Sequence, residues 1–138
     1  MSLQRFLDAQ EGIYQQALAE LRAGRKRTHW MWFVFPQLAG LGHSATAVHY
    51  AIADLAEAQD FLAHPLLGAR LEECARALLE VRGRTAHDIL GSPDDLKLRS
   101  SMTLFAEVAG PDSVFQRVLE RYYGGGQVVR CDSNDNRY

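Results

Sequence analysis

Residues 92–109 read SPDDLKLRSSMTLFAEVA, and this stretch carries the clearest helix signal in the chain. Ser92 can cap a helix and Pro93 suits its first position. The two acidic residues that follow suit the first turn, where the helix dipole favours negative charge. Apolar residues then recur at helical spacing as far as Ala109, and a Gly-Pro pair ends the pattern. The stretch therefore predicts one long amphipathic helix.

Similar apolar stripes, bounded by capping residues and glycines, occupy most of the remaining chain. They predict further helices over residues 3–24, 44–53, 55–63, 65–83, 85–90 and 112–123. Alternating strand patterns are almost absent. Helices without strands bury their apolar faces against one another, so the sequence predicts an all-α domain.

Residues 28–36, THWMWFVFP, interrupt this pattern. The segment is dense in aromatic side chains, which usually indicate burial, and it is too bulky for a free surface loop. We expect a buried extended segment or a short irregular helix that ends at Pro36. The fold class expected is all-α: a compact single-domain bundle of about six to seven helices with one buried aromatic non-helical segment.

The length and composition are those of one globular domain. The chain has 138 residues, of which 47% are hydrophobic and 23% charged, and its net charge is −2. A domain of this size buries enough surface to fold without disulfides or metals. We expect a helical domain over residues 1–126 and a flexible C-terminal tail over residues 127–138, because that tail is polar and aperiodic.

Several function classes are disfavoured. The acidic net charge argues against a dedicated nucleic-acid binder. The longest apolar run is far shorter than the roughly 20 residues that span a bilayer, and the N-terminus lacks the apolar stretch of a signal peptide. Cys74 and Cys131 have no zinc-binding spacing, so we expect free thiols, a cytoplasmic protein and no cofactor or metal. Catalytic motifs such as GxSxG and HExxH are absent.

A first candidate site lies in the basic and aromatic stretch that begins at residue 25. It contains Arg25, Arg27, His29, Trp30 and Trp32. Arginines bind phosphate, an indole stacks on a nucleobase or another planar group, and the imidazole is a candidate acid or base. The alternative is structural: the basic residues complement the C-terminal end of a helix and the aromatic rings fill the core.

A second candidate lies on the predicted long helix, where Lys97 precedes Ser100 and Ser101 by three and four residues. A lysine with two hydroxyl groups on one helix face can hold an anion, or can form a nucleophile with its activator. Hydroxyl groups within a helix are mildly unfavourable and call for a reason. The alternative is that they donate to backbone carbonyls of the preceding turn.

The histidines do not point to a metal site. No two of them are four residues apart, and they stand at His29, His43, His49, His64 and His87. Metal binding would therefore need a convergence that spacing does not show. Of the five, His29 has the basic and aromatic neighbours that best suit a functional role.

The two longest motifs resemble a bacterial family, domain-of-unknown-function family eighteen-ten. They are RKRTHWMWFVFPQ at residues 25–37 and SPDDLK at residues 92–97 with SSMTLF at residues 100–105; YAI at 50–52 and HPLLG at 64–68 are further matches. The resemblance covers roughly residues 3–124 and implies a compact, mainly α-helical domain without a settled activity.

Members are often labelled calpastatin, but a calpastatin-type inhibitor is a long disordered chain, whereas this chain has enough apolar residues for a full core. A more remote likeness is to NADAR-type helical domains that act on ADP-ribose linkages. Their motifs do not match this sequence residue by residue, so that likeness assigns no roles.

The best hypothesis is binding, with hydrolysis as an extension, of a small anionic, nucleotide-like metabolite. Its catalytic candidates are His29 and Lys97, and its ligand-binding candidates are Arg25, Arg27, Trp30, Trp32, Ser100 and Ser101. The alternative is a protein-interaction module or a homodimerising domain without catalysis. That module would present the aromatic run 30–35, or Tyr122 and Tyr123 of the last helix, on its surface.

Overall fold

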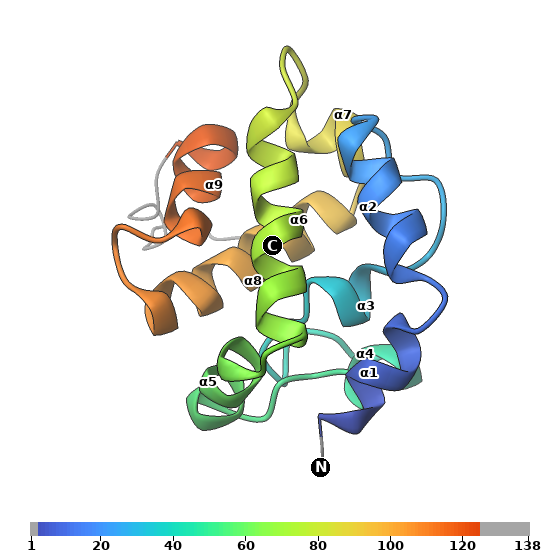
Figure 1. Cartoon of the computed structure of the whole chain (residues 1–138), viewed down its shortest axis with the longest axis vertical. Helices are drawn as coiled ribbons and strands as arrows, with labels where there is room; N and C mark the ends of the chain where they lie inside the picture. Colours follow the sequence, from blue (N-terminus) through green and yellow to red (C-terminus); the bar gives the residue numbers. More distant parts are fainter. Residues whose placement is uncertain (1–2, 125–138) are drawn as a thin grey trace.

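The computed structural model describes residues 3–124, which form nine helices and no β-strand. The helices are α1 (Gln4–Gln10), α2 (Tyr14–Arg22), α3 (Met31–Val34), α4 (Ala45–His49), α5 (Leu55–Ala63), α6 (Leu67–Glu80), α7 (Ala86–Leu90), α8 (Asp94–Ala109) and α9 (Val114–Tyr123). In Figure 1, α6 runs through the middle with α2 and α9 on either side, and it packs against both. The all-α class is confirmed for these residues, whereas the expected tail at 127–138 lies outside them.

The helix count differs from the six to seven expected, partly because the first predicted helix is two helices. The chain turns at Gly12, whose φ of 77° lies in the left-handed region that glycine tolerates best, and α1 and α2 lie on either side of this turn. Gln10 is a polar residue, yet its side chain is buried at the end of α1. Its amide donates to the carbonyl of Phe33 at 2.7 Å, so it secures the aromatic segment.

The aromatic segment is buried from Trp30 to Phe35 except at Trp32, and of the two expected forms it takes the short helix, so the description of the segment as non-helical is wrong. Residues Met31–Val34 form the single turn α3. The amides of Val34 and Phe35 donate to the carbonyls of Trp30 and Met31 at 3.1 and 3.0 Å. A helical turn satisfies these backbone groups locally, which an isolated buried extended segment cannot do without a partner strand.

The helix over residues 92–109 is confirmed, with a different first turn. Pro93, rather than Ser92, occupies the N-cap position, and no side chain caps the helix there. The peptide bond between Ser92 and Pro93 is cis. Asp94 and Asp95 stand in the first turn as predicted.

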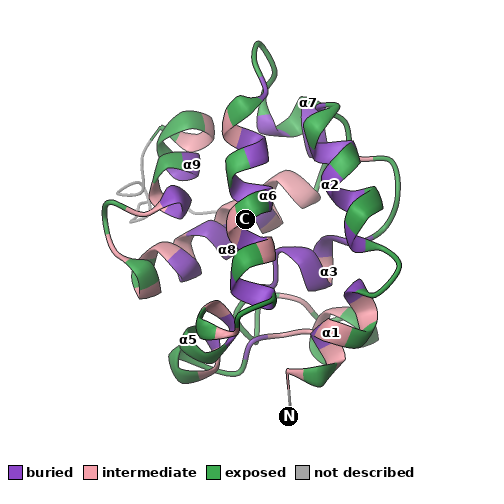
Figure 2. Ribbon diagram, viewed as in Figure 1, coloured by how far each residue is buried: buried purple, intermediate pink, exposed green. Residues whose placement is uncertain are grey.

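The core is one cluster of buried side chains drawn from most of the helices. Figure 2 shows buried positions on the inward faces of α2, α6 and α9 and exposed positions on their outer faces. Four phenylalanine rings connect α1, α5, α8 and α9. Centroid distances are 5.0 Å from Phe6 to Phe61, 5.5 Å from Phe61 to Phe105 and 5.9 Å from Phe105 to Phe115. Rings at these separations add favourable pair contacts to the burial of their area.

A buried carboxylate ties α2 to the chain that follows it. Glu20 is only 3% exposed, and its Oε1 accepts hydrogen bonds from the backbone amides of Arg27 and Thr28 and from the indole Nε1 of Trp30, at 2.8, 3.0 and 2.8 Å. Its Oε2 accepts from the Thr28 hydroxyl at 2.7 Å and from Gln16 at 2.8 Å. Burial alone would raise the pKa of Glu20, but these donors outweigh it and lower the pKa to about 2.

Close packing of α5 and α6 depends on Gly68. A Cβ at this position would lie 1.9 Å from the carbonyl oxygen of Leu62, which belongs to the backbone of α5. Backbone cannot move aside as a flexible side chain can, so only glycine fits. None of the helices formed by residues 3–124 has the length and apolarity needed to cross a bilayer.

We predict that Glu20→Gln lowers the free energy of unfolding at pH 7 by about 2–4 kcal/mol, because the amide replaces an acceptor with an NH₂ group among buried donors. The charged carboxylate stabilises the fold above its usual pKa of 4.5, and this contribution is lost as the pH falls from 4.5 through 2. The wild type should therefore lose more stability than the variant over this range. Urea unfolding at pH 7, 4 and 3 measures both effects.

The matched control is Glu107→Gln, at an exposed position of α8, which should change the free energy of unfolding by less than about 0.5 kcal/mol. Equal stability of Glu20→Gln and the wild type at pH 7 would contradict the role given to Glu20.

We predict that Gly68→Ala costs about 3 kcal/mol or more, because α5 and α6 must separate to admit the methyl group. Gly83→Ala is the comparison: nothing lies within 4 Å of a Cβ there, so only the strain of a φ of 72° is at stake. That change should cost about 1–2 kcal/mol. Urea denaturation of both variants tests the order, and equal losses would show that α5 and α6 do not constrain Gly68.

Candidate functional site

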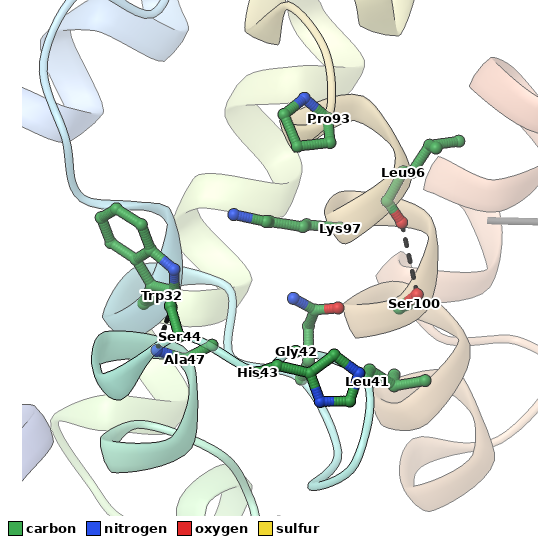
Figure 3. A pocket seen from close by; sticks show the side chains of 11 residues that line it. Trp32, Leu41, Gly42, His43, Ser44, Ala47, Pro93, Leu96, Lys97 and Ser100 are labelled. Atoms are coloured by element: carbon green, nitrogen blue, oxygen red, sulfur yellow. Dashed lines mark hydrogen bonds between the residues drawn. The ribbon is translucent and has the colours of Figure 1, made fainter.

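A pocket of about 360 Å³ opens between the first turns of α8, the indole of Trp32 and the segment 37–47. Figure 3 shows Lys97 extending from α8 across this space toward Trp32. The apolar part of the wall consists of Trp32, Leu41, Ala47, Pro93 and Leu96, together with Gly42. The polar part consists of Gln37, His43, Ser44, Lys97 and Ser100. Largely apolar walls with a few polar groups are typical of small-molecule sites.

Helix geometry places the α8 side of the pocket. Leu96 and Lys97 are consecutive, Pro93 precedes them by three and four residues, and Ser100 follows them by four and three, so all four lie on one side of the start of α8. The helix therefore presents an ammonium group and a hydroxyl group on the same side as two apolar side chains.

The opposite side of the pocket is a loop closed at its base. The amide of Ala39 donates to the carbonyl of Ile52 at 2.7 Å, and the amide of Ile52 donates to that of Gln37 at 2.8 Å. Within the loop, a Cβ on Gly42 would lie 2.7 Å from the Cβ of Ala47, so the lack of a side chain lets residue 42 approach α4. The loop thereby brings His43 and Ser44 to the pocket.

Lys97 is partly buried and points at the aromatic wall. Its side chain is 24% exposed, and Nζ lies 4.9 Å from the centroid of the Trp32 ring. Nζ also lies 3.5 Å from Oδ1 of Asp94, which is longer than the roughly 2.8 Å of a charge-assisted hydrogen bond. An ammonium group has three protons, so this loose pair leaves capacity for a ligand.

Asp94 is shared between two lysines. Its Oδ2 lies 3.0 Å from Nζ of Lys26, whose side chain is 9% exposed, while Oδ1 faces Lys97. Nζ of Lys26 lies 5.2 Å from the centroid of the Trp30 ring. The two lysines and the two tryptophans are thus linked through a single carboxylate at the start of α8.

The two tryptophans have different roles. Trp30 is fully buried and donates to Glu20, so its ring faces offer nothing to a ligand. Trp32 is half-buried and forms part of the pocket wall. Of the two indoles proposed as stacking surfaces, only Trp32 is in position to contact a bound molecule.

The basic residues and the imidazole of the first candidate lie elsewhere. Arg25, Arg27 and His29 are exposed, and none of them belongs to the pocket wall. The backbone of Arg27 donates to Glu20, so this residue helps to hold the segment in place. The structure does not bring His29 into one pocket with Lys97.

Of the two hydroxyl groups of the second candidate, that of Ser100 follows the structural alternative and that of Ser101 does not. Ser100 lines the pocket and donates to the carbonyl of Leu96 at 3.3 Å. Ser101 is fully buried, and its hydroxyl is the one buried side-chain polar atom without a hydrogen-bond partner among residues 3–124. Ser101 does not belong to the pocket wall.

The segments proposed as a protein-interaction surface are largely tied to the fold. From Trp30 to Phe35 every residue except Trp32 is buried. The hydroxyl of Tyr122 donates to the carbonyl of Leu78, and that of Tyr123 donates to the carbonyl of Asp95. These aromatic residues therefore do not form an exposed patch.

Several wall residues carry no functional signal in the sequence. His43, Gln37 and Ser44 lie in or beside a glycine-containing loop. Asp94, which pairs with Lys97 but does not line the pocket, has the sequence pattern of a first-turn dipole partner. The short spacing of Gly40 and Gly42 indicates a tight loop. That this loop lines the same pocket as α8 follows only from the tertiary structure. Residues 3–124 contain no group of three or more His, Cys, Asp or Glu side chains arranged to hold a metal ion.

A second hollow of about 450 Å³ lies along α2 and α6. Its charged side chains pair with neighbours on the surface: Arg22 lies 3.5 Å from Glu73, and Arg76 lies 3.7 Å from Glu72. It has no aromatic wall, so the pocket at Lys97 is the better candidate for a ligand.

Comparison with known proteins identifies the family. Residues 1–133 match the family described as "Protein of unknown function (DUF1810)", and the chain belongs to this family. The family predicted from the motifs is therefore confirmed. The comparisons do not show the more remote likeness to NADAR-type domains.

A solved structure has the same fold. The chain is similar to the conserved hypothetical protein Rv1873 from Mycobacterium tuberculosis, with 55% sequence identity and a TM-score of 0.89. The match covers 93% of this chain and 91% of that chain. No curated protein matches the chain.

We predict that Trp32→Phe removes most of the tryptophan emission that acrylamide quenches, because the remaining indole of Trp30 is fully buried. The quenching constant should fall severalfold, while the native variant keeps the fluorescence emission of Trp30. The quenching constant is measured by Stern–Volmer titration of the native variant with acrylamide, and the urea-unfolded variant is the control. Unchanged quenching would show that the indole of Trp30 is accessible.

Proposed function

We propose that this member of the family binds a small anionic metabolite with a planar, nucleotide-like group in the pocket between α8 and the segment 37–47. The observation that supports the proposal is the position of Lys97, whose ammonium group extends across an open, largely apolar pocket beside Trp32. A volume of about 360 Å³ is sufficient for a small metabolite.

The pocket combines charged and polar groups on one part of its wall with an apolar surface on the other. Lys97 supplies the positive charge for an anionic group, and Ser44, Gln37 and Ser100 supply hydrogen-bonding groups nearby. Trp32 and the aliphatic wall receive a planar apolar body, whose removal from water contributes to affinity. This division suits a ligand that has a charged end and a flat end.

Binding rather than hydrolysis is the function proposed. Hydrolysis needs an acid or base within reach of the bound molecule, and His29 does not belong to the pocket wall. The imidazole that does belong to it is that of His43. If the bound molecule is turned over, His43 and Lys97 are the side chains positioned to move a proton.

A ligand pocket is preferred to an interaction module because the aromatic patch that such a module needs is buried. Trp30, Phe33 and Phe35 contribute to the core rather than to the surface. The half-buried aromatic residue of this run, Trp32, faces the pocket instead.

Thermal-shift measurements test the proposal with cyclic AMP, AMP, ADP, ADP-ribose, sugar phosphates and a polyanion as probes. A ligand at 100 times its Kd stabilises the fold by about 2.7 kcal/mol, which corresponds to a rise in Tm of about 5–10 °C at this size. We predict such a rise for at least one small probe, and its loss in Lys97→Met, which keeps the aliphatic stem but removes the charge.

The double variant Arg25→Ala with Arg27→Ala separates this pocket from the basic cluster. It should keep the shift, because neither arginine lines the pocket. Loss of the shift in the double variant but not in Lys97→Met would place the anion site on the basic cluster. No shift with any probe would contradict the proposed function.

A further inference from the structure

We infer that Asp94 makes the pocket selective for ligands with a single negative charge, such as a carboxylate or a phosphate diester on a flat apolar body. The inference rests on the proposed function, because it concerns which anions the same pocket accepts. Asp94 acts as a specificity-determining residue, because its carboxylate repels any second negative charge on a ligand.

The fixed charges beside the pocket determine this selectivity. Among the described residues of the wall, Lys97 is the one side chain with a permanent charge. Its ammonium group faces Asp94 at 3.5 Å, and Asp94 faces Lys26 at 3.0 Å. Two lysines and one aspartate leave one net positive charge, which a monoanion neutralises. A dianion would leave an unpaired negative charge beside Asp94 in a partly buried site.

Asp94 is held where it is by a buried partner. The side chain of Lys26 is 9% exposed, lies beside the Trp30 ring, and has its backbone amide bonded to the carbonyl of Ile89 at 2.6 Å. If the carboxylate of Asp94 turned away, the charge of Lys26 would be left buried without its partner, which is costly. An incoming anion therefore shares Lys97 with Asp94 rather than displacing it.

The start of α8 supplies little further attraction for an anion. The amide of Asp95 donates to the carbonyl of Gly91 at 2.9 Å, and the amides of Leu96 and Lys97 donate to that of Pro93 at 3.0 and 3.1 Å. These backbone groups are already paired, so they cannot cradle a phosphate as free amides at a helix start do. Recognition of a ligand's charge therefore depends on Lys97 and on Asp94, whose carboxylate partly neutralises the ammonium group of Lys97.

The remaining wall favours an apolar body over further charges. Leu41, Leu96, Pro93 and Trp32 surround the space that Lys97 crosses. A polyphosphate would place charged oxygens against these side chains, whereas a planar ring would bury apolar area there.

The test is a calorimetric titration with ligands that share one body and differ in charge. Cyclic AMP, AMP and ADP carry about one, two and three negative charges on the same adenosine. The pair 1-naphthoate and 2,3-naphthalenedicarboxylate repeats the comparison on a carboxylate body. For the wild type we expect the monoanion of a series to bind at least about tenfold more tightly than the most highly charged member, a difference of about 1.4 kcal/mol.

Two variants distinguish selectivity from simple attraction. Asp94→Asn keeps the shape and an oxygen acceptor for Lys26 but removes the charge, so it should bind the dianions and trianions at least about tenfold more tightly and abolish the preference. Asp95→Asn is the matched control: it removes the neighbouring first-turn carboxylate, which pairs with His87 at 3.5 Å rather than with Lys97. It should leave the preference as in the wild type. Thermal unfolding without ligand confirms that both variants are folded.

The outcomes separate the inference from the proposed function. If the probes bind and the preference for the monoanion is absent from the wild type, or survives in Asp94→Asn, the charge-selecting role of Asp94 is wrong while the pocket stands. If no probe binds to the wild type or to Asp94→Asn, the proposed function fails and the inference fails with it.

Discussion

The carboxylate of Glu20 accepts hydrogen bonds from four residues, three of which lie in the segment that follows α2. Burying a carboxylate is expensive unless its oxygens are satisfied, so α2 and this segment reach their native arrangement together. The result is a fixed position for Trp30, which is fully buried, and a fixed direction for the chain that enters α3. Gln10 secures the far end of the same turn through the carbonyl of Phe33.

The arrangement of α2 and the segment that follows it also determines the geometry of the candidate pocket. Trp32 follows Trp30 by two residues and forms the wall toward which Lys97 extends. Lys26, which precedes Trp30 in the same segment, holds Asp94 at the start of α8. One side of the pocket is therefore fixed by the contacts of a buried segment and the other by a long helix. Walls fixed in this way would reduce the ordering cost of binding the proposed ligand.

The sequence predicts the helices well where their signals are local. The helices ending near Ala63, Ala109 and Tyr123 fall where capping residues, apolar periodicity and glycines place them. The sequence does not predict the division between α1 and α2, because apolar residues at helical spacing stand on both sides of Gly12, where the chain turns. For the site, the sequence indicated Lys97, Trp32 and Ser100, which the structure does place together. It could not indicate that Trp30 donates to a buried carboxylate, nor that the loop containing His43 faces α8, because both depend on contacts between distant residues.

The proposed pocket is tested most directly by a titration of the ¹⁵N-labelled chain with cyclic AMP, followed through the two indole N–H resonances and the backbone amides. Binding in this pocket should shift the resonances of the Trp32 indole and of the backbone amides of residues 37–44 and 94–97 together. The resonance of the Trp30 indole, which donates to Glu20, should not shift. Shifts confined to residues 25–29, or a Trp30 resonance that moves while that of Trp32 does not, would contradict the account.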